Sequence, residues 1–225
     1  MRNVSKCYPN GSNALEDVNV EIKKGEFVFV VGPSGAGKST FIKMIFREEL
    51  PTQGSLVVNG RNVTEMKLKD VPYLRRGLGI VFQDYRLLQD KTVYENVAFA
   101  MQVVEAPRRE MQKRVNTVLD LVGLKDKVKS FPSQLSGGEQ QRVAIARAIV
   151  NNPMVVIADE PTGNLDPETS WDIMKIFDRI NKDGTTIVMA THDKSIVDTM
   201  KKRVIAIENG RIIRDEAKGV YGYED

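Results

Sequence analysis

The chain has 225 residues, of which 41% are hydrophobic and 28% are charged, and this composition is typical of folded globular domains rather than of disordered chains. Its 33 basic and 30 acidic side chains nearly cancel, so the formal net charge of +3 does not indicate nucleic-acid binding. The single cysteine excludes an intrachain disulfide and a cysteine-based metal centre, and the single histidine excludes any mechanism that needs two imidazoles. We therefore expect a protein of the reducing cytosol with no nucleic-acid partner.

Short apolar runs bounded by turn residues predict a mainly parallel α/β sheet. Asn59-Gly60 and Asn209-Gly210 each separate two apolar runs and predict hairpins. None of these runs is long enough to cross a bilayer, and the first residues lack the apolar stretch of a signal peptide. The expected strands cover residues 27–31, 56–58, 78–82, 154–158, 185–190, 204–207 and 211–213.

The middle of the chain, from about residue 85 to residue 150, contains no convincing strand. Apolar residues recur there at helical spacing, with Pro107 near the start of the pattern and Gly123 just past its end. We therefore expect one folded unit over residues 1–225, in which a helical subdomain (85–153) is inserted into an α/β core (1–84 and 154–225).

A glycine-rich loop follows the first buried strand and precedes a helical run over residues 40–47. Its glycines allow successive backbone N–H groups to surround phosphate oxygens, and the helix N-terminus adds partial positive charge. We expect Lys38 to reach the β- and γ-phosphates of a nucleotide, Ser39 to bind Mg²⁺ and Thr40 to donate to the α-phosphate. The loop reads Gly32-Pro33-Ser34-Gly35-Ala36-Gly37-Lys38-Ser39.

A second apolar strand ends in two carboxylates, Asp159 and Glu160. Mg²⁺ prefers hard oxygen ligands, so Asp159 is expected to hold the ion from a strand next to the glycine-rich loop. Glu160 is then placed to polarise a water that attacks the γ-phosphate, and general-base action of this kind contributes ~10²–10⁴-fold to rates.

A third motif opens a helix in the predicted helical subdomain and provides a second anion site, because a hydroxyl and two glycine N–H groups meet at a helix N-terminus. If both anion sites faced one nucleotide within a monomer, the helical subdomain would have to fold back onto its own glycine-rich loop. The motif is Leu135-Ser136-Gly137-Gly138-Glu139-Gln140.

These three motifs, in this order, resemble the nucleotide-binding domain of ABC ATPases over essentially the entire chain. The resemblance implies a P-loop NTPase fold with a mixed, RecA-like sheet, an antiparallel β subdomain and the inserted helical subdomain. It implies Mg²⁺-dependent hydrolysis of ATP in a head-to-tail homodimer, in which the signature 135–140 of one subunit closes over ATP on the other.

Further residues match functional positions of that family. Gln83 matches the glutamine that senses Mg²⁺ and the γ-phosphate, and His192 matches the histidine that contacts the γ-phosphate. The string Asn164-Leu165-Asp166 matches the D-loop at the dimer seam. Tyr8 matches the aromatic residue that stacks on adenine, although an exposed tyrosine in a turn is the alternative. Because few residues precede Tyr8, we expect the family's first strand to be short or missing.

Four segments, 46–49, 81–88, 158–166 and the tail 219–225, resemble the cell-division branch of the ABC ATPases. That branch implies an FtsX-like integral membrane partner, docked near residues 84–100 at the cytoplasmic face of the cell membrane, at the division septum. ATP hydrolysis would then control peptidoglycan hydrolases and move no solute directly.

Other interpretations stay open. The apolar residues of 84–100 are equally compatible with subdomain core, and the clusters of lysine and arginine with solvated surface. An ATPase subunit of a transporter for lipoprotein release, drug or peptide export or amino-acid import differs from the division protein only in its membrane partner. A DNA-repair or translation ABC protein is disfavoured, since the chain has no coiled-coil insertion, zinc cysteines or second cassette.

Overall fold

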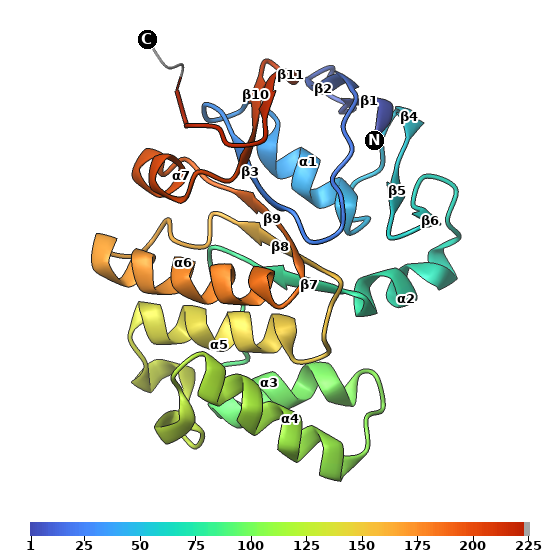
Figure 1. Ribbon diagram of the computed structural model, residues 1–225. Coiled ribbons are helices and arrows are strands. Elements are labelled where there is room, and N and C mark those ends of the chain that lie inside the picture. The colour runs from blue at the N-terminus through green and yellow to red at the C-terminus, as the bar shows by residue number, and fades with distance from the viewer. Residues whose placement is uncertain (223–225) are drawn as a thin grey trace.

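The computed structural model describes residues 1–222, so the last three residues of the tail singled out above lie outside the described part. Its central feature is a six-stranded sheet in the order β11-β10-β3-β9-β8-β7, in which only β11 runs antiparallel to its neighbour (Figure 1). The predicted parallel sheet and C-terminal hairpin are confirmed. The strands are β3 (Phe27–Val31), β7 (Leu78–Val81), β8 (Val155–Asp159), β9 (Thr186–Ala190), β10 (Arg203–Glu208) and β11 (Arg211–Glu216).

The two faces of this sheet carry different helices. All five residues of β3 are buried, and alternate side chains enter opposite cores. Phe29 packs into a core formed with α5 and α6, whereas Val28 and Val30 pack into a core formed with α1. The sheet therefore separates α1 from α5 and α6 (Figure 1). These helices are α1 (Lys38–Ile45), α5 (Gly137–Ile149) and α6 (Pro167–Lys182), and α7 (Lys194–Met200) follows β9.

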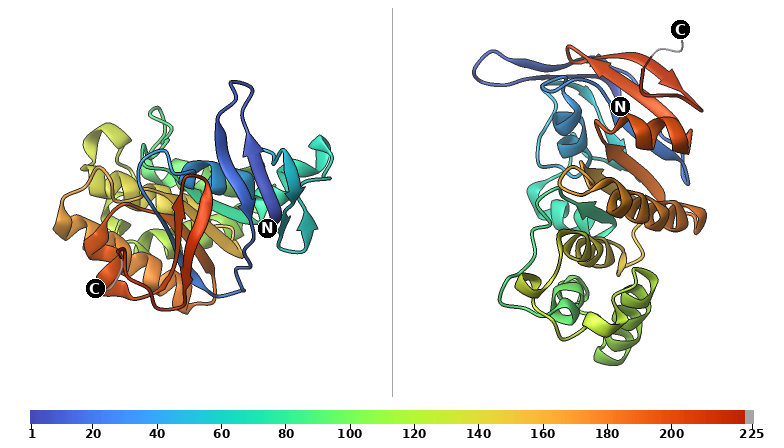
Figure 2. Two further views of the ribbon diagram at one scale, coloured as in Figure 1. Left: turned by 90° about the horizontal axis from the view of Figure 1, so that it is seen from above. Right: turned by 90° about the vertical axis from the view of Figure 1, so that its left-hand side faces the viewer.

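Antiparallel strands cover the end of the molecule opposite to α3 and α4 (Figure 2). The expectation that the first strand is short or missing is wrong, because a six-residue β1 pairs with β2 on one side and β4 on the other. The predicted Asn59-Gly60 hairpin is confirmed as β5 paired with β6. The strands are β1 (Arg2–Cys7), β2 (Asn13–Val18), β4 (Gln53–Ser55), β5 (Val57–Val58) and β6 (Arg61–Asn62).

The segment between β7 and β8 is helical, as expected. Its apolar residues share one core with a face of the six-stranded sheet, so the division into subdomains at residues 85 and 153 stays a prediction. None of the helices within residues 1–222 is long and apolar enough to cross a bilayer. The remaining helices are α2 (Val71–Arg76), α3 (Val93–Gln102) and α4 (Arg108–Leu121), with short 3₁₀ turns at η1 (Leu68–Asp70), η2 (Lys125–Lys127) and η3 (Pro132–Gln134).

One buried amide fixes the chain that enters this helical segment. Asn96 on α3 is fully buried, and its Oδ1 accepts a hydrogen bond of 2.8 Å from the backbone N–H of Leu88. Its Nδ2 donates to the carbonyls of Leu88, Lys91 and Thr92 at 3.0, 3.1 and 3.0 Å. The side chain thus supplies the hydrogen-bond partner of the Leu88 N–H and of the Lys91 carbonyl, adds a second donor at the carbonyls of Leu88 and Thr92, and holds residues 88–92 against α3.

We predict that Asn96→Ala lowers the free energy of unfolding by about 2–4 kcal/mol, because the Leu88 N–H and the Lys91 carbonyl lose their partner and the buried amide is removed. Equilibrium urea unfolding measures this change. Gln102→Ala, at the exposed end of the same helix, is the control and should change stability by less than about 0.5 kcal/mol. Equal stability of the two variants would contradict this role of Asn96.

Candidate nucleotide site

The glycine-rich loop joins β3 to α1 in a turn that only glycine allows at two positions. Gly32 has φ of 146°, and a Cβ there would lie 2.1 Å from the carbonyl oxygen of Ile207. Gly37 has φ of 110°, and a Cβ there would lie 2.3 Å from the carbonyl oxygen of Ala14. The loop is therefore pressed against β10 on one side and β2 on the other, which holds its backbone in place.

The side chain of Lys38 forms hydrogen bonds with the backbone of its own loop. Lys38 is only 8% exposed, and its Nζ donates to the carbonyl oxygens of Gly32 at 2.8 Å and Pro33 at 3.0 Å. Pro33, Ser34, Gly35 and Ser39 are exposed, whereas Ala36 and Thr40 are buried. The exposed residues form the accessible part of the loop, and Lys38 would have to exchange these carbonyl oxygens for phosphate oxygens in order to bind a phosphate.

Tyr8 lies next to the first turn of α1. Its hydroxyl is 3.2 Å from Oγ1 of Thr40, and the Nζ of Lys6 lies 4.9 Å from the centre of its ring. Tyr8 is half-buried. This position beside the glycine-rich loop suits an aromatic residue that stacks on a nucleotide base, while Thr40 uses its hydroxyl for Tyr8.

Asp159 ends β8, and Glu160 follows it with a left-handed backbone at φ of 49°. A non-glycine residue in this region is held there by its surroundings, here by a hydrogen bond from the N–H of Glu160 to the carbonyl of Ala190 at 3.0 Å. Burial, and then the negative charge of Glu160, raise the pKa of Asp159. A buried carboxylate whose charge is destabilised in this way is a suitable donor for a divalent cation.

Glu160 and His192 form one unit. The Nδ1 of His192 lies 2.8 Å from Oε2 of Glu160, and the backbone N–H of His192 donates to the same oxygen at 3.2 Å. The histidine side chain is 64% exposed, at the end of β9 next to β8. The carboxylate thus orients the ring through Nδ1 and leaves Nε2 for another partner.

Gln83 and the D-loop contact each other. The Nε2 of Gln83 donates to Oδ1 of Asn164 at 3.3 Å, and Nδ2 of Asn164 donates to the carbonyl of Gln83 at 3.4 Å. Asp166 caps α6 by accepting a hydrogen bond from the N–H of Thr169 at 2.9 Å, and hydrogen bonds from Thr169 lower the pKa of Asp166. The two loops that follow β7 and β8 are therefore linked through side chains.

The signature motif begins α5 with a capping box. The Oγ of Ser136 accepts from the N–H of Glu139 at 3.2 Å, and the Glu139 carboxylate accepts from the N–H of Ser136 at 2.9 Å. These backbone bonds lower the pKa of Glu139, and Lys127 forms an ion pair with it at 3.2 Å. Leu135 is buried, and its carbonyl accepts from Nε2 of Gln140 at 3.2 Å.

The signature glycines lie against the D-loop and α6 rather than against the glycine-rich loop. A Cβ on Gly137 would lie 3.4 Å from the side chain of Leu165, and one on Gly138 would lie 2.4 Å from Cγ2 of Thr169. The structure therefore brings together the predicted residues at the ends of β3, β7, β8 and β9, and it leaves the signature 135–140 on the other face of the sheet.

Two tertiary contacts to this region were not predicted from the sequence. The guanidinium of Arg147 donates to the carbonyls of Arg86 at 2.5 Å and Tyr85 at 2.7 Å, two consecutive residues with φ of 47° and 58°. The amide of the buried Gln141 donates to the carbonyl of Pro161 at 2.7 Å. Both residues lie on α5, and no local pattern separates them from the other polar residues of that helix.

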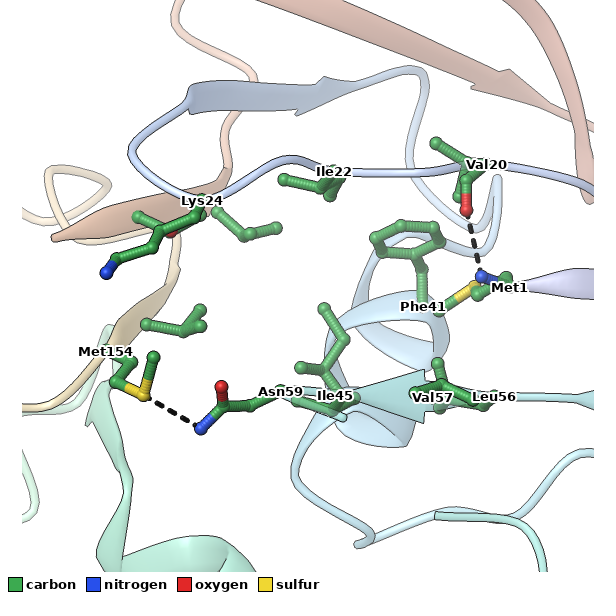
Figure 3. A pocket seen from close by; sticks show the side chains of 14 residues that line it. Met1, Val20, Ile22, Lys24, Phe41, Ile45, Leu56, Val57, Asn59 and Met154 are labelled. Atoms are coloured by element: carbon green, nitrogen blue, oxygen red, sulfur yellow. Dashed lines mark hydrogen bonds between the residues drawn. The ribbon is translucent and has the colours of Figure 1, made fainter. Parts of the chain in front are cut away.

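A mainly apolar cavity of about 170 Å³ lies between α1 and the β5 segment (Figure 3). Phe41 and Ile45 of α1 form one wall, the β5 segment forms another and Met154 lies at one end. None of the candidate site residues lines this cavity. It is therefore separate from the nucleotide site, which is the surface formed by the loops at the carboxyl ends of the parallel strands.

Comparisons with known proteins agree with this geometry. The family described as ABC transporter matches residues 15–163. The chain is 64% identical over 225 residues to the cell division ATP-binding protein FtsE of Streptococcus pneumoniae (strain D39), covering 100% of this chain and 98% of that protein. It is 62% identical over 225 residues to FtsE of Bacillus subtilis, with 100% and 99% covered, and 47% identical over 209 residues to FtsE of Escherichia coli K12, with 93% and 94% covered.

Solved structures with a similar fold were also found. A dimeric ATP-binding cassette in a post-hydrolysis state, bound to ADP and Pi, is 36% identical with a TM-score of 0.87, and the match covers 99% of this chain and 98% of that one. The cbiO1 protein of Clostridium perfringens, part of an ABC transporter complex, is 33% identical with a TM-score of 0.90, covering 97% and 87%. The fold is that of an ABC ATPase cassette, and ATP is its substrate. The chain belongs to the ABC ATPases and, within them, to the FtsE family of cell-division ATP-binding proteins.

Proposed function

We propose that this ATPase works as a head-to-tail homodimer with two composite ATP sites and drives an FtsX-like integral membrane protein. The observation that carries the proposal is the separation of the two anion-binding motifs: the glycine-rich loop and α1 lie on one face of the sheet, and the signature of α5 lies on the other. A second subunit can supply the missing signature. Dimeric cassettes among the structural relatives support this arrangement.

Within each composite site, the residues present fit a Mg²⁺ ion. The hydroxyl of Ser39, the carboxylate of Asp159 and the amide oxygen of Gln83 are hard oxygen donors, which is the chemistry that Mg²⁺ prefers. When bound, the ion would neutralise charge on the β- and γ-phosphates. Lys38 would add a further positive charge after it leaves the carbonyls of its loop.

Glu160 is the proposed general base. Its carboxylate follows the proposed Mg²⁺ ligand directly, and its left-handed backbone places it at the end of β8 next to His192. We infer that Glu160 accepts a proton from the attacking water while His192, oriented by that carboxylate, contacts the γ-phosphate through Nε2. The base and the phosphate contact thus belong to one hydrogen-bonded unit.

We predict that Glu160→Gln lowers ATP turnover by about 10²–10⁴-fold, because the amide cannot accept the proton. ATP should still bind, since neither Lys38 nor Ser39 changes, and the closed dimer should accumulate. Phosphate release and gel filtration with MgATP measure the two effects. Wild-type turnover in this variant would contradict the assignment of the base.

The proposed docking surface for the membrane partner is a groove of about 430 Å³ between α2, α3 and α5. It overlaps the predicted segment 84–100 at Phe99 and Ala100 and extends beyond it to Val103 and to α2. Phe99 and Val103 are 47% and 48% exposed and line the same groove, and exposed apolar side chains that lie together are typical of an interaction site. Arg75 and Arg76 also line it, so the groove fits an amphipathic segment with acidic flanks.

Arg147 connects this groove with the loop that follows Gln83. This residue lines the groove and holds the carbonyls of Tyr85 and Arg86, which follow Gln83 in a left-handed conformation. A shift of α5 relative to the sheet would move Gln83 and its contact with Asn164. We propose that residues 85–153 move as the helical subdomain and that this contact transmits the nucleotide state to the partner.

The cellular role follows from the relatives, which are cell division proteins. We propose that the complex lies at the cytoplasmic face of the cell membrane, at the septum, where ATP-driven movement of the partner controls peptidoglycan hydrolysis. The subunit itself then needs no solute site. Capture of the integral protein from membranes distinguishes this role from solute transport, since a solute permease would be recovered in the second case.

We predict that Phe99→Glu reduces recovery of the membrane partner at least tenfold, on the order of the cost of burying one unpaired charge in an apolar interface. ATP turnover by the isolated subunit should stay within about twofold, because Phe99 lies on α3, outside the loops that carry the candidate site residues. Val57→Glu is the matched control, since Val57 is 57% exposed on β5, outside the groove. Equal recovery with both variants would exclude this groove as the docking surface.

A further inference from the structure

The C-terminal segment 217–222 returns from β11 and is fastened along β10 and α7 (Figure 1). The N–H of Gly219 donates to the carbonyl of Lys202 at 3.1 Å, and a Cβ on Gly219 would lie 2.8 Å from Cβ of Val204, so the segment approaches β10 closely. The N–H of Tyr221 donates to Oδ1 of Asp198 on α7 at 2.6 Å.

Arg214 of β11 also forms hydrogen bonds with this segment. Its guanidinium donates to the carbonyls of Val220, Tyr221 and Gly222 at 2.6, 2.9 and 2.6 Å. Three consecutive carbonyls held by one guanidinium fix the backbone of the segment, because the donors of arginine form a rigid fork. We call residues 217–222 the C-terminal strap.

The strap places the phenol of Tyr221 against the start of the glycine-rich loop. The hydroxyl of Tyr221 is 3.5 Å from the carbonyl oxygen of Gly32, and the ring, Gly32 and Pro33 line one cavity of about 240 Å³ with Ile207. Burial raises the pKa of Tyr221, and the negative charge of Glu160 raises it further.

Gly32 therefore has two donors at its carbonyl oxygen, Nζ of Lys38 at 2.8 Å and the hydroxyl of Tyr221 at 3.5 Å. Lys38 must leave this oxygen to reach a phosphate. A partly buried carbonyl that loses its donor costs free energy, and that cost would oppose nucleotide binding. The Tyr221 hydroxyl lies where it can retain the hydrogen bond after Lys38 leaves.

We propose that Tyr221 is a positioning residue for nucleotide binding, whose hydroxyl keeps the Gly32 carbonyl hydrogen-bonded when Lys38 moves to the phosphates. The C-terminal strap thereby sets the affinity of the glycine-rich loop for ATP and ADP. The proposal rests on the role of Lys38 in phosphate binding and is independent of the membrane partner.

Tyr221→Phe tests the hydroxyl, since it keeps the packing of the ring. We expect the Kd for ADP and for a non-hydrolysable ATP analogue to rise about three- to tenfold, as for the loss of one net hydrogen bond, with kcat within about twofold of wild type. Tyr73→Phe is the matched control, because Tyr73 is 56% exposed on α2 and contacts Arg76. Unchanged affinity, or a lower kcat at unchanged affinity, would overturn the proposal.

A double-mutant cycle distinguishes the strap from a general loss of packing. Arg214→Lys removes the guanidinium that holds the strap and should weaken the binding of both nucleotides by a factor similar to that of Tyr221→Phe. The variant that carries both changes should bind them no more weakly than the single variant with the lower affinity. Additive effects would mean that the two residues act separately and would contradict the proposal. Lys38→Ala, measured in parallel, tests the phosphate role itself: normal binding by that variant would refute the proposed function of the loop, whereas its failure to bind leaves the Tyr221 result decisive.

Discussion

A six-stranded sheet separates the two anion-binding motifs of this chain, and the arrangement of the whole site depends on that separation. The alternation along β3 sends Phe29 into the core shared with α5 and α6 and sends Val28 and Val30 into the core shared with α1. The glycine-rich loop precedes α1 and the signature precedes α5, so one chain carries the two motifs, which are the proposed half-sites, on different faces of its sheet. Because both cores are densely packed, closing one half-site onto the other within a chain would disrupt them.

Side chains in both motifs already have hydrogen-bond partners. Lys38 bonds to carbonyls of its loop, Glu160 bonds to His192, and Ser136 exchanges bonds with Glu139. At Lys38, ATP binding would therefore exchange existing hydrogen bonds for charge-assisted ones, so the net gain from this contact is modest. We infer that affinity depends on what holds the backbone in place during that exchange, which gives the Tyr221 contact its importance.

The sequence allowed prediction of the features that local patterns determine. Buried apolar runs and Asn-Gly turns predict the parallel strands and both hairpins, and the spacing of Gly32 to Ser39 predicts the strand–loop–helix unit. The presence of β1 could not be predicted from the few residues before Tyr8, because its stability comes from pairing with β2 and β4 on both sides. The contacts of Tyr221 with Gly32, 189 residues apart, and of Arg147 with Tyr85, 62 residues apart, depend on tertiary packing that no local pattern encodes.

The central claim is that each ATP site contains Lys38 of one subunit and Ser136 of the other. ATP turnover by two kinds of mixed dimer tests it most directly. In the first, one subunit carries Lys38→Ala and the other carries Ser136→Arg; a head-to-tail dimer then combines both lesions in one site and keeps the other intact, with up to about half of the wild-type activity if the sites act independently. In the second, one subunit carries both changes and its partner carries none, so each site has one lesion and turnover should fall to background. An active second dimer with an inactive first dimer would contradict the account, because that result requires both motifs of one chain to act on the same nucleotide.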